Sequence, residues 1–138
     1  MEMTSKEYLN QAFRIDRRIL AKTEQLESLR AVMVRTSKAL TGMPGNPNKD
    51  RSQLEETMVK ALELERMIKE DTERLMDLKR EITLAVREVD DVQCQMLLEL
   101  RYLCFRTWEE IAAELDCSVR NVHFMHGRAL GMVKVPKK

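Results

Sequence analysis

The side chains best suited to chemistry in this sequence are basic and amide groups near the C-terminal end. From Ser118 onward the chain contains five basic residues, two histidines and no carboxylate: Arg120, His123, His126, Arg128, Lys134, Lys137 and Lys138. Positive groups without nearby carboxylates are what contact with nucleic-acid phosphates requires. Arginine and asparagine can also hydrogen-bond to the edges of guanine and adenine, respectively. The alternative interpretation of this segment is a solvated basic tail.

Two short helices joined by a tight turn are predicted to position these groups. Thr107 and Glu110 have the spacing of a capping box, in which each side chain takes a free backbone N–H group at the helix start. Ala112 is small enough to let two helices cross closely. The segment 116–118 breaks the apolar pattern, and Ser118 is a favourable N-cap for the second helix. Spacings of three and four residues predict the inward side of that helix to be Val122, Met125, Ala129 and Leu130.

A helix, a three-residue turn and a second helix form a helix-turn-helix, whose second helix can enter a DNA major groove. The residues expected to face base edges are Ser118, Val119, Arg120, Asn121, His123 and Phe124. In this arrangement Arg120 is expected to contact guanine, Asn121 adenine, and a methyl group of Val119 thymine. The residues expected to contact phosphates, without reading sequence, are Arg106, Thr107, Arg128 and Lys134. The alternative is a helix-turn-helix that serves only as a packing module for protein contact.

The residues of this region resemble a known family. The runs LLELRY at 97–102, TWEEIA at 107–112 and RAL at 128–130, together with Ser118, resemble region four of sigma-70-like RNA polymerase sigma factors. More narrowly, the chain is similar to small phage and prophage proteins that carry such a module behind a helical N-terminal segment. The resemblance implies a transcription regulator of bacterial or phage origin that binds promoter DNA, recruits RNA polymerase in transcription initiation and, in some cases, controls late phage genes.

Residues typical of catalysis or metal binding are not found. The chain has no phosphate-cradling glycine loop, HExxH motif or GxSxG motif, so we expect no enzyme and no cofactor. A zinc site of Cys117, His123 and His126 would lack a fourth ligand, and we expect both histidines to lie near phosphates or base edges. With Cys94 and Cys104 the cysteines are odd in number and widely spaced, which favours reduced thiols. No membrane-spanning run or signal-peptide core is apparent, so we expect a soluble cytoplasmic protein with no membrane partner.

Upstream of the helix-turn-helix, the sequence predicts two long amphipathic helices and hence an all-α protein. Charged residues make up 34% of the chain and aromatic residues 4%, which favours exposed helices over a large globular core. The first helix is expected over 4–40, beginning with a capping box of Thr4 and Glu7. Its predicted heptad seam is Ala12, Ile15, Ile19, Thr23 or Lys22, Leu26, Leu29, Met33 and Leu40.

The segment 41–50, rich in Gly, Pro and Asn, is predicted to be a connecting loop, with a binding loop as the alternative. A capping box of Ser52 and Glu55 is expected to begin the second long helix. Its predicted apolar positions are Leu54, Met58, Ala61, Leu62, Ile68, Leu75, Leu78, Ile82, Val86 and Val89. We expect an antiparallel, coiled-coil-like hairpin over 1–89, followed by a three-helix module containing the helix-turn-helix over 90–138.

The first helix of that module is expected over 92–104, capped by Asp90 or Asp91. It should support the helix-turn-helix with Met96, Leu97, Leu100 and either Tyr102 or Leu103. The hairpin carboxylates are predicted to lie on solvated faces and in i,i+4 pairs: Glu55, Glu56, Glu63, Glu65, Glu70, Asp71 and Glu73.

Apolar side chains beyond a single seam suggest that the hairpin forms a homo-oligomer or captures a partner: Leu20, Met33, Leu64, Met67 and Met76. A dimer could form a four-helix arrangement of two hairpins. The alternative function is a non-DNA-binding adaptor, or an anti-sigma-like protein, that uses the hairpin to bind RNA polymerase or another protein.

Overall fold

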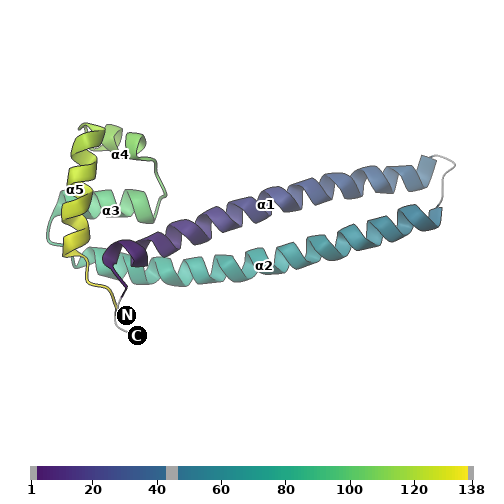
Figure 1. Ribbon diagram of the computed structural model, residues 1–138, viewed down its shortest axis with the longest axis horizontal. Coiled ribbons are helices and arrows are strands. Elements are labelled where there is room, and N and C mark those ends of the chain that lie inside the picture. The colour runs from purple at the N-terminus through teal and green to yellow at the C-terminus, as the bar shows by residue number, and fades with distance from the viewer. Residues whose placement is uncertain (1–2, 43–46, 137–138) are drawn as a thin grey trace. The chain divides into compact units, whose positions relative to one another are not determined.

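The computed structural model describes residues 3–42 and 47–136, and the regular structure of that part is entirely helical. It contains five α-helices in the order α1 (Ser5–Gly42), α2 (Pro47–Arg87), α3 (Val92–Tyr102), α4 (Trp108–Glu114) and α5 (Val119–Met132) (Figure 1). The predicted all-α class is therefore confirmed. Within the same ranges, no helix combines the length and the apolar character needed to cross a lipid bilayer.

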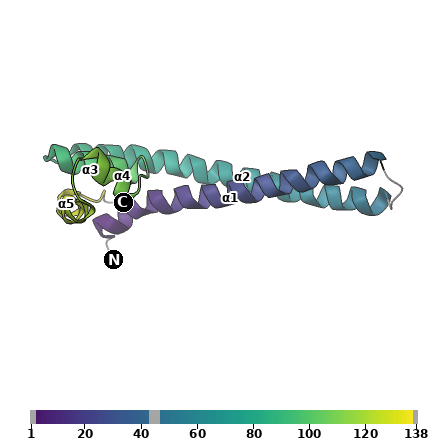
Figure 2. The same cartoon turned by 90° about the horizontal axis from the view of Figure 1, so that it is seen from above.

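The chain divides into two compact units. The head unit consists of Met1–Asp16 and Arg74–Lys138, and the hairpin unit consists of Arg17–Glu73. Within the hairpin unit, α1 and α2 run antiparallel and lie side by side in both views (Figure 1 and Figure 2), as the predicted hairpin requires. The boundaries of these units differ from those of the expected segments 1–89 and 90–138. The first turns of α1 and the last turns of α2 belong to the same compact unit as α3, α4 and α5.

The start of α1 is fixed by local hydrogen bonds. The Thr4 hydroxyl accepts from the backbone N–H of Glu7 at 3.1 Å and donates to the Glu7 carboxylate at 3.0 Å. The next residue, Ser5, donates its hydroxyl proton to the carbonyl oxygen of Val133 at 3.1 Å. The Thr4 hydroxyl thus caps α1 as predicted, whereas the Glu7 carboxylate pairs with that hydroxyl and not with the Thr4 backbone N–H of a full capping box. The start of α1 is also joined to the segment that follows α5.

The predicted loop 41–50 is wrong at both ends. Helix α1 continues to Gly42 and α2 begins at Pro47, while residues 43–46 lie outside the described part. Proline suits the first helical position because it has no N–H group to satisfy and its φ is already near the helical value. The predicted helix start at Ser52 is also wrong, because Ser52 lies inside α2.

The seam of the hairpin unit follows heptad spacing in both helices. The buried and half-buried side chains at that spacing are Ile19, Lys22, Leu26, Leu29, Met33 and Thr36 on α1, and Leu54, Thr57, Ala61, Leu64, Ile68 and Asp71 on α2. The predicted seam positions Met58 and Leu62 are wrong, because these side chains are 48% and 63% exposed. The prediction selected apolar residues and therefore passed over Thr57 and Asp71. The side chain of Leu40 lies outside the described part.

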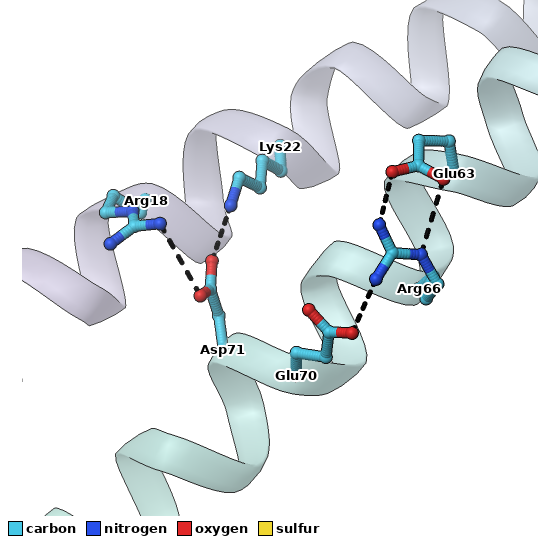
Figure 3. Close-up of polar contacts among 6 residues, drawn as sticks. All are labelled: Arg18, Lys22, Glu63, Arg66, Glu70 and Asp71. Carbon is cyan, nitrogen blue, oxygen red and sulfur yellow. Dashed lines mark hydrogen bonds and ion pairs between the residues drawn. The ribbon is translucent and has the colours of Figure 1, made fainter.

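Asp71 is the main polar residue of this seam. Its carboxylate pairs with Lys22 Nζ at 2.6 Å and with Arg18 at 3.7 Å, both from α1 (Figure 3). The prediction of a solvated carboxylate is wrong for Asp71, which is 5% exposed. It holds for Glu63 and Glu70, which are exposed and flank Arg66 on α2 (Figure 3). Of the residues predicted to lie beyond the seam, Leu20 and Met76 are exposed, whereas Met33, Leu64 and Met67 are half-buried.

The core of the head unit lies where α3, α4 and α5 meet. Its buried centre is Leu97, Ile111, Ala112 and Val122, against which half-buried Leu100, Trp108, Leu115, Cys117, Val119 and Met125 pack. Helix α3 is capped by Asp91, whose carboxylate accepts from the backbone N–H of Cys94 at 3.0 Å. Helix α3 ends at Tyr102, two residues before the predicted Cys104, and it exposes Met96, which was expected to be inside.

The ends of the two long helices complete the head unit. Buried side chains come from α1 (Tyr8, Leu9, Ala12, Ile15) and from α2 and the residues after it (Leu75, Leu78, Ile82, Ala85, Val86, Val89). The Gln95 amide of α3 donates to the carbonyl oxygens of Val86 and Arg87, each at 3.2 Å. The rings of Phe13 and Phe105 lie edge to face with centroids 6.0 Å apart. Within the head unit, these contacts join the short helices and the segments beside them to the N-terminal end of α1 and the C-terminal end of α2.

Candidate nucleic-acid interface

The turn between α4 and α5 is built by backbone hydrogen bonds that the sequence favours. Asp116 has a φ of 54°, in the left-handed region, which aspartate tolerates better than most residues. The backbone N–H of Cys117 donates to the carbonyl oxygen of Ala112 at 3.0 Å, and that of Asp116 donates to Ala113 at 3.3 Å. This pair of bonds is a Schellman motif, which ends α4 and reverses the chain.

Both helices of the predicted helix-turn-helix begin with the predicted caps. The Thr107 hydroxyl accepts from the Glu110 backbone N–H, and the Glu110 carboxylate accepts from the Thr107 backbone N–H, each at 3.1 Å. The latter bond holds the pKa of Glu110 below its usual value. At the start of α5, the Ser118 hydroxyl accepts from the Asn121 backbone N–H at 3.1 Å. The Thr107 and Ser118 hydroxyls are therefore structural caps as well as exposed polar groups.

The predicted base-reading residues are mostly exposed on α5. Arg120, Asn121, His123 and Phe124 are exposed, and the Phe124 ring has an exposed fraction of 72%. Val119 is half-buried and packs against the head-unit core, so less of it is available for a base contact. The structure thus places the predicted polar set together on one short stretch of helix.

His123 is exposed but held in place. Its ring lies against Trp108 of α4, with centroids 4.8 Å apart. The Arg101 guanidinium of α3 lies over the Trp108 ring, 4.2 Å from its centroid. Because Trp108 is restrained by the core, it limits the orientations that His123 can adopt. The ring of His123 is therefore presented from a preorganised position.

His126 is not a surface group, and the expectation that it lies near phosphates or base edges is wrong. It is 8% exposed, and its Nε2 atom is 2.7 Å from the Tyr102 hydroxyl oxygen. Burial, with the nearby positive charges of Lys6 and Arg101 and with His123, lowers the pKa of His126 from 6.5 to about 4. The signal was present in the sequence, because position 126 follows Val122 by four residues and shares its inward face.

The predicted phosphate-contacting residues differ in their partners. Arg106 lies 4.0 Å from the Glu110 carboxylate, and Arg128 lies 3.9 Å from the Asp91 carboxylate. Lys134 follows the end of α5 and is exposed. Both salt bridges have exposed members, so each is weak and can exchange for a contact with a phosphate group.

One face of α5 combines these features, and we call it the α5 outer face. It consists of residues that are all exposed and that recur at spacings of three and four: Arg120, Asn121, Phe124, Gly127, Arg128 and Gly131. The sequence contains no carboxylate after Asp116. The outer face can therefore approach an anionic surface without repulsion from its own helix, and it offers hydrogen-bond donors and one aromatic ring.

The described residues contain no comparable arrangement for binding a metal ion. Over 3–42 and 47–136, no three His, Cys, Asp or Glu side chains gather closely enough to hold a metal ion. Cys94 is buried, Cys104 is exposed and Cys117 is half-buried, and all three are free thiols. The three residues of the imagined zinc site are instead used in packing and in the bond to Tyr102.

Comparison of the chain with protein-family models, with curated protein sequences and with solved structures found no match. The resemblance of residues 97–130 to sigma region four stays a prediction from those residues. The same holds for the assignment of individual side chains to bases and phosphates.

Proposed function

We propose that this protein is a DNA-binding transcription regulator that acts in transcription initiation. The observation that supports it most is the α5 outer face, which carries Arg120, Asn121 and Arg128 and no carboxylate. A three-helix core with capped helices and a Schellman turn holds this face rigidly. A rigid, positively charged helix that projects from such a support is suited to the major groove of duplex DNA.

In this proposal the side chains divide into two groups. Arg120 forms a bidentate pair with guanine and Asn121 with adenine, near the start of α5 where base edges are within reach. Arg106, Thr107, Arg128 and Lys134 contact phosphates and set the orientation of the head unit on the duplex. His123 belongs to the base-reading group, and its ring lies against that of Trp108 with centroids 4.8 Å apart.

The mechanism would be recruitment, with no catalytic step. The head unit binds a promoter, and the hairpin unit contacts RNA polymerase or a second copy of the protein. The resemblance to sigma region four supports this division of labour. On the same basis we propose a cytoplasmic location in a bacterium and a role like that of the phage and prophage regulators, some of which control late genes.

A salt titration tests the proposal. The purified protein is titrated onto duplex DNA from upstream of its own gene and, separately, onto random duplex DNA. We expect preferential binding to one fragment, with the logarithm of the binding constant falling linearly as the logarithm of the salt concentration rises. Equal, weak binding to both DNAs would reduce the segment to a basic tail, and no binding would exclude DNA as the ligand.

A second candidate function is an adaptor that binds a protein through the hairpin unit. An open groove between α1 and α2 of this unit is lined in part by Leu29, Val59 and Leu64, and Met58 and Leu62 are exposed on α2. Exposed apolar side chains next to a groove are typical of protein-binding surfaces. This candidate predicts a tight protein partner for the hairpin unit and no salt-dependent binding of DNA.

A further inference from the structure

The most exposed large apolar side chain in the described residues lies in the middle of the α5 outer face. Phe124 is 72% exposed, while the apolar residues on the other side of the same helix, Val122 and Ala129, are fully buried. Exposure of one aromatic ring is common at protein surfaces and requires no explanation by itself. The surroundings of this ring supply the further observations.

Two glycines leave the face around Phe124 bare. A Cβ atom added at Gly127 or at Gly131 would meet no other atom within 4 Å, so neither glycine is required by packing. Neither has a positive φ, so neither is required by backbone conformation. Glycine inside a helix costs stability relative to alanine, and one recognised reason to retain it is close approach of the backbone to a ligand.

The positive charge of the residues around Phe124 indicates that the ligand is anionic. Arg120 precedes Phe124 by four residues and Arg128 follows it by four, so the two arginines flank Phe124 along one face of α5. Arginine pairs well with phosphate and with guanine, whereas a phenyl ring can pair with neither. Duplex DNA offers an apolar group at the level of its base edges, because the 5-methyl group of thymine projects into the major groove.

We propose that Phe124 reads a thymine through its 5-methyl group, with the bare helix backbone at Gly127 against the wall of the major groove. This inference rests on the proposed function and adds to it a base preference that no hydrogen-bonding residue of α5 supplies. Cytosine without a methyl group, and uracil, present no apolar contact at that position. Discrimination by Phe124 is therefore discrimination by a single methyl group.

The test begins with a library of duplex DNA that has a randomised core, from which the full-length protein selects its preferred sequence. Each thymine of the selected duplex is then replaced in turn by deoxyuridine, which keeps the base pair and removes only the methyl group. At one position we expect a loss of affinity of about fourfold, the value of one buried methyl group. Phe124→Ala should bind the thymine and deoxyuridine duplexes equally.

Asn121→Ala is the matched control for Phe124→Ala. It removes another exposed side chain of the outer face and should weaken binding, but it should leave the ratio between thymine and deoxyuridine duplexes unchanged. A wild-type protein that binds every deoxyuridine duplex as tightly as the thymine duplex would overturn the inference. The same conclusion would follow if Phe124→Ala kept the full wild-type ratio. Failure of the library to yield any sequence preferred over random DNA would instead remove the proposed function on which the inference rests.

The glycine provides an independent readout. Gly127→Ala should raise the melting temperature of the protein, because alanine favours the helix, and yet lower its affinity for the selected duplex several-fold. Gly131→Ala lies one turn further from the start of α5 and serves as the control, with a smaller loss of affinity. If Gly127→Ala stabilised the protein and left DNA affinity unchanged, close approach of the duplex at this position would be excluded.

Discussion

Among the described residues, the hairpin unit contains a buried ion pair in addition to surface pairs, whereas the ion pairs of the head unit lie at the surface. In the hairpin unit, the side chains of Lys22 and Asp71 are 13% and 7% exposed, and they replace apolar residues in the seam. In the head unit, those of Arg128 and Asp91 are 56% and 36% exposed and lie 3.9 Å apart at the surface. The first pair is part of the packing, whereas the second is weak enough to be exchanged for another anion. The comparison indicates that one fixed charge pair belongs to the hairpin seam, whereas the charges of the head unit can be exchanged, as the proposed DNA interface requires.

The number of packed layers explains why the seam can hold a charge. Only two helices meet in the hairpin unit, so the long side chain of Lys22 on one helix reaches the Asp71 carboxylate on the other at 2.6 Å. In the head unit, α3, α4 and α5 belong to one compact unit with the first turns of α1 and the last turns of α2. A buried polar residue of this unit is His126, which is hydrogen-bonded to Tyr102. Burial there favours the neutral imidazole and lowers the pKa of His126 to about 4. The core of the head unit therefore favours the uncharged form of His126.

The largest effect is expected from breaking the buried pair. Asp71→Ala leaves the Lys22 ammonium in the seam without its 2.6 Å partner, and we expect the free energy of unfolding to fall by about 3 kcal/mol. Chemical denaturation followed by circular dichroism measures this change. The combined replacement Lys22→Leu with Asp71→Leu should recover most of the loss, because it removes both charges and fills the seam.

Glu70→Ala is the control for Asp71→Ala. It removes a carboxylate one residue earlier on α2 that pairs with Arg66 at the surface, and it should cost less than about 0.5 kcal/mol. Equal effects of Glu70→Ala and Asp71→Ala would show that burial of the Asp71 pair contributes nothing.

The features predicted correctly from the sequence are those that depend on residues close together in the chain. The capping box of Thr107 and Glu110 and the caps Ser118 and Asp91 are all confirmed, since each requires a suitable side chain next to a helix start and a partner three residues away. The exposure of Arg120 and Asn121 was also predicted, because the inward residues of α5 fix the outward ones by helical spacing. Their contacts with bases remain predictions.

The features missed from the sequence depend on distant partners. A polar residue at a seam position is indistinguishable from a surface residue until its partner is known, and Asp71 finds Lys22 49 residues away. The inward position of His126 follows from its spacing to Val122, but its hydrogen-bond partner, the Tyr102 hydroxyl, lies 24 residues away in the chain. Once Thr57 and Asp71 are excluded from the stripe, Met58 and Leu62 become the apolar choice, which gives the wrong face of α2. Pro47 was read as a helix breaker because its place at the first helical position depends on where the helix begins.

Because His126 is buried in its neutral form, we expect the free energy of unfolding to fall by roughly 2 kcal/mol at acid pH. The folded-state pKa of His126 lies at about 4, below the unfolded value of 6.5, so the unfolded chain binds the proton first as the pH falls. This contribution to stability is complete above about pH 6.5 and is lost progressively toward pH 4. Thermal unfolding at a series of pH values measures it, and His126→Gln should flatten the profile in this window.

His123→Gln is the matched control for His126→Gln. His123 lies on the same helix and also contacts Trp108, but its ring is exposed. The acid sensitivity of His123→Gln should therefore equal that of the wild type. If both variants kept the wild-type profile, protonation of His126 would not be the cause of acid destabilisation.

The exchangeable charges of the head unit predict a difference between two basic residues in DNA binding. Arg120→Ala should lower the affinity for the selected duplex by about 1–3 kcal/mol and relax preference at one base pair. Lys134→Ala should weaken binding to selected and random duplexes alike and reduce the salt slope by about one. Fluorescence anisotropy with both duplexes at several salt concentrations measures these effects. If each variant changed specific and random binding equally, the assignment of Arg120 to a base would be wrong.

The smallest expected effect comes from freeing the surface pair of the head unit. Asp91→Asn keeps a side-chain oxygen to cap α3, so the bond from the Cys94 backbone N–H is retained, while the negative charge beside Arg128 is removed. A phosphate would then bind Arg128 without displacing a carboxylate, and affinity for duplex DNA should rise slightly, about twofold, at low salt and return to the wild-type value at high salt. Asp90→Asn removes the same charge one residue earlier, away from the cap, and should have a smaller effect. Equal gains in DNA affinity from the two changes would show that Asp91 acts only through the net charge of the protein. A gain in affinity specific to Asp91→Asn would identify the Asp91–Arg128 pair as the contact that DNA replaces.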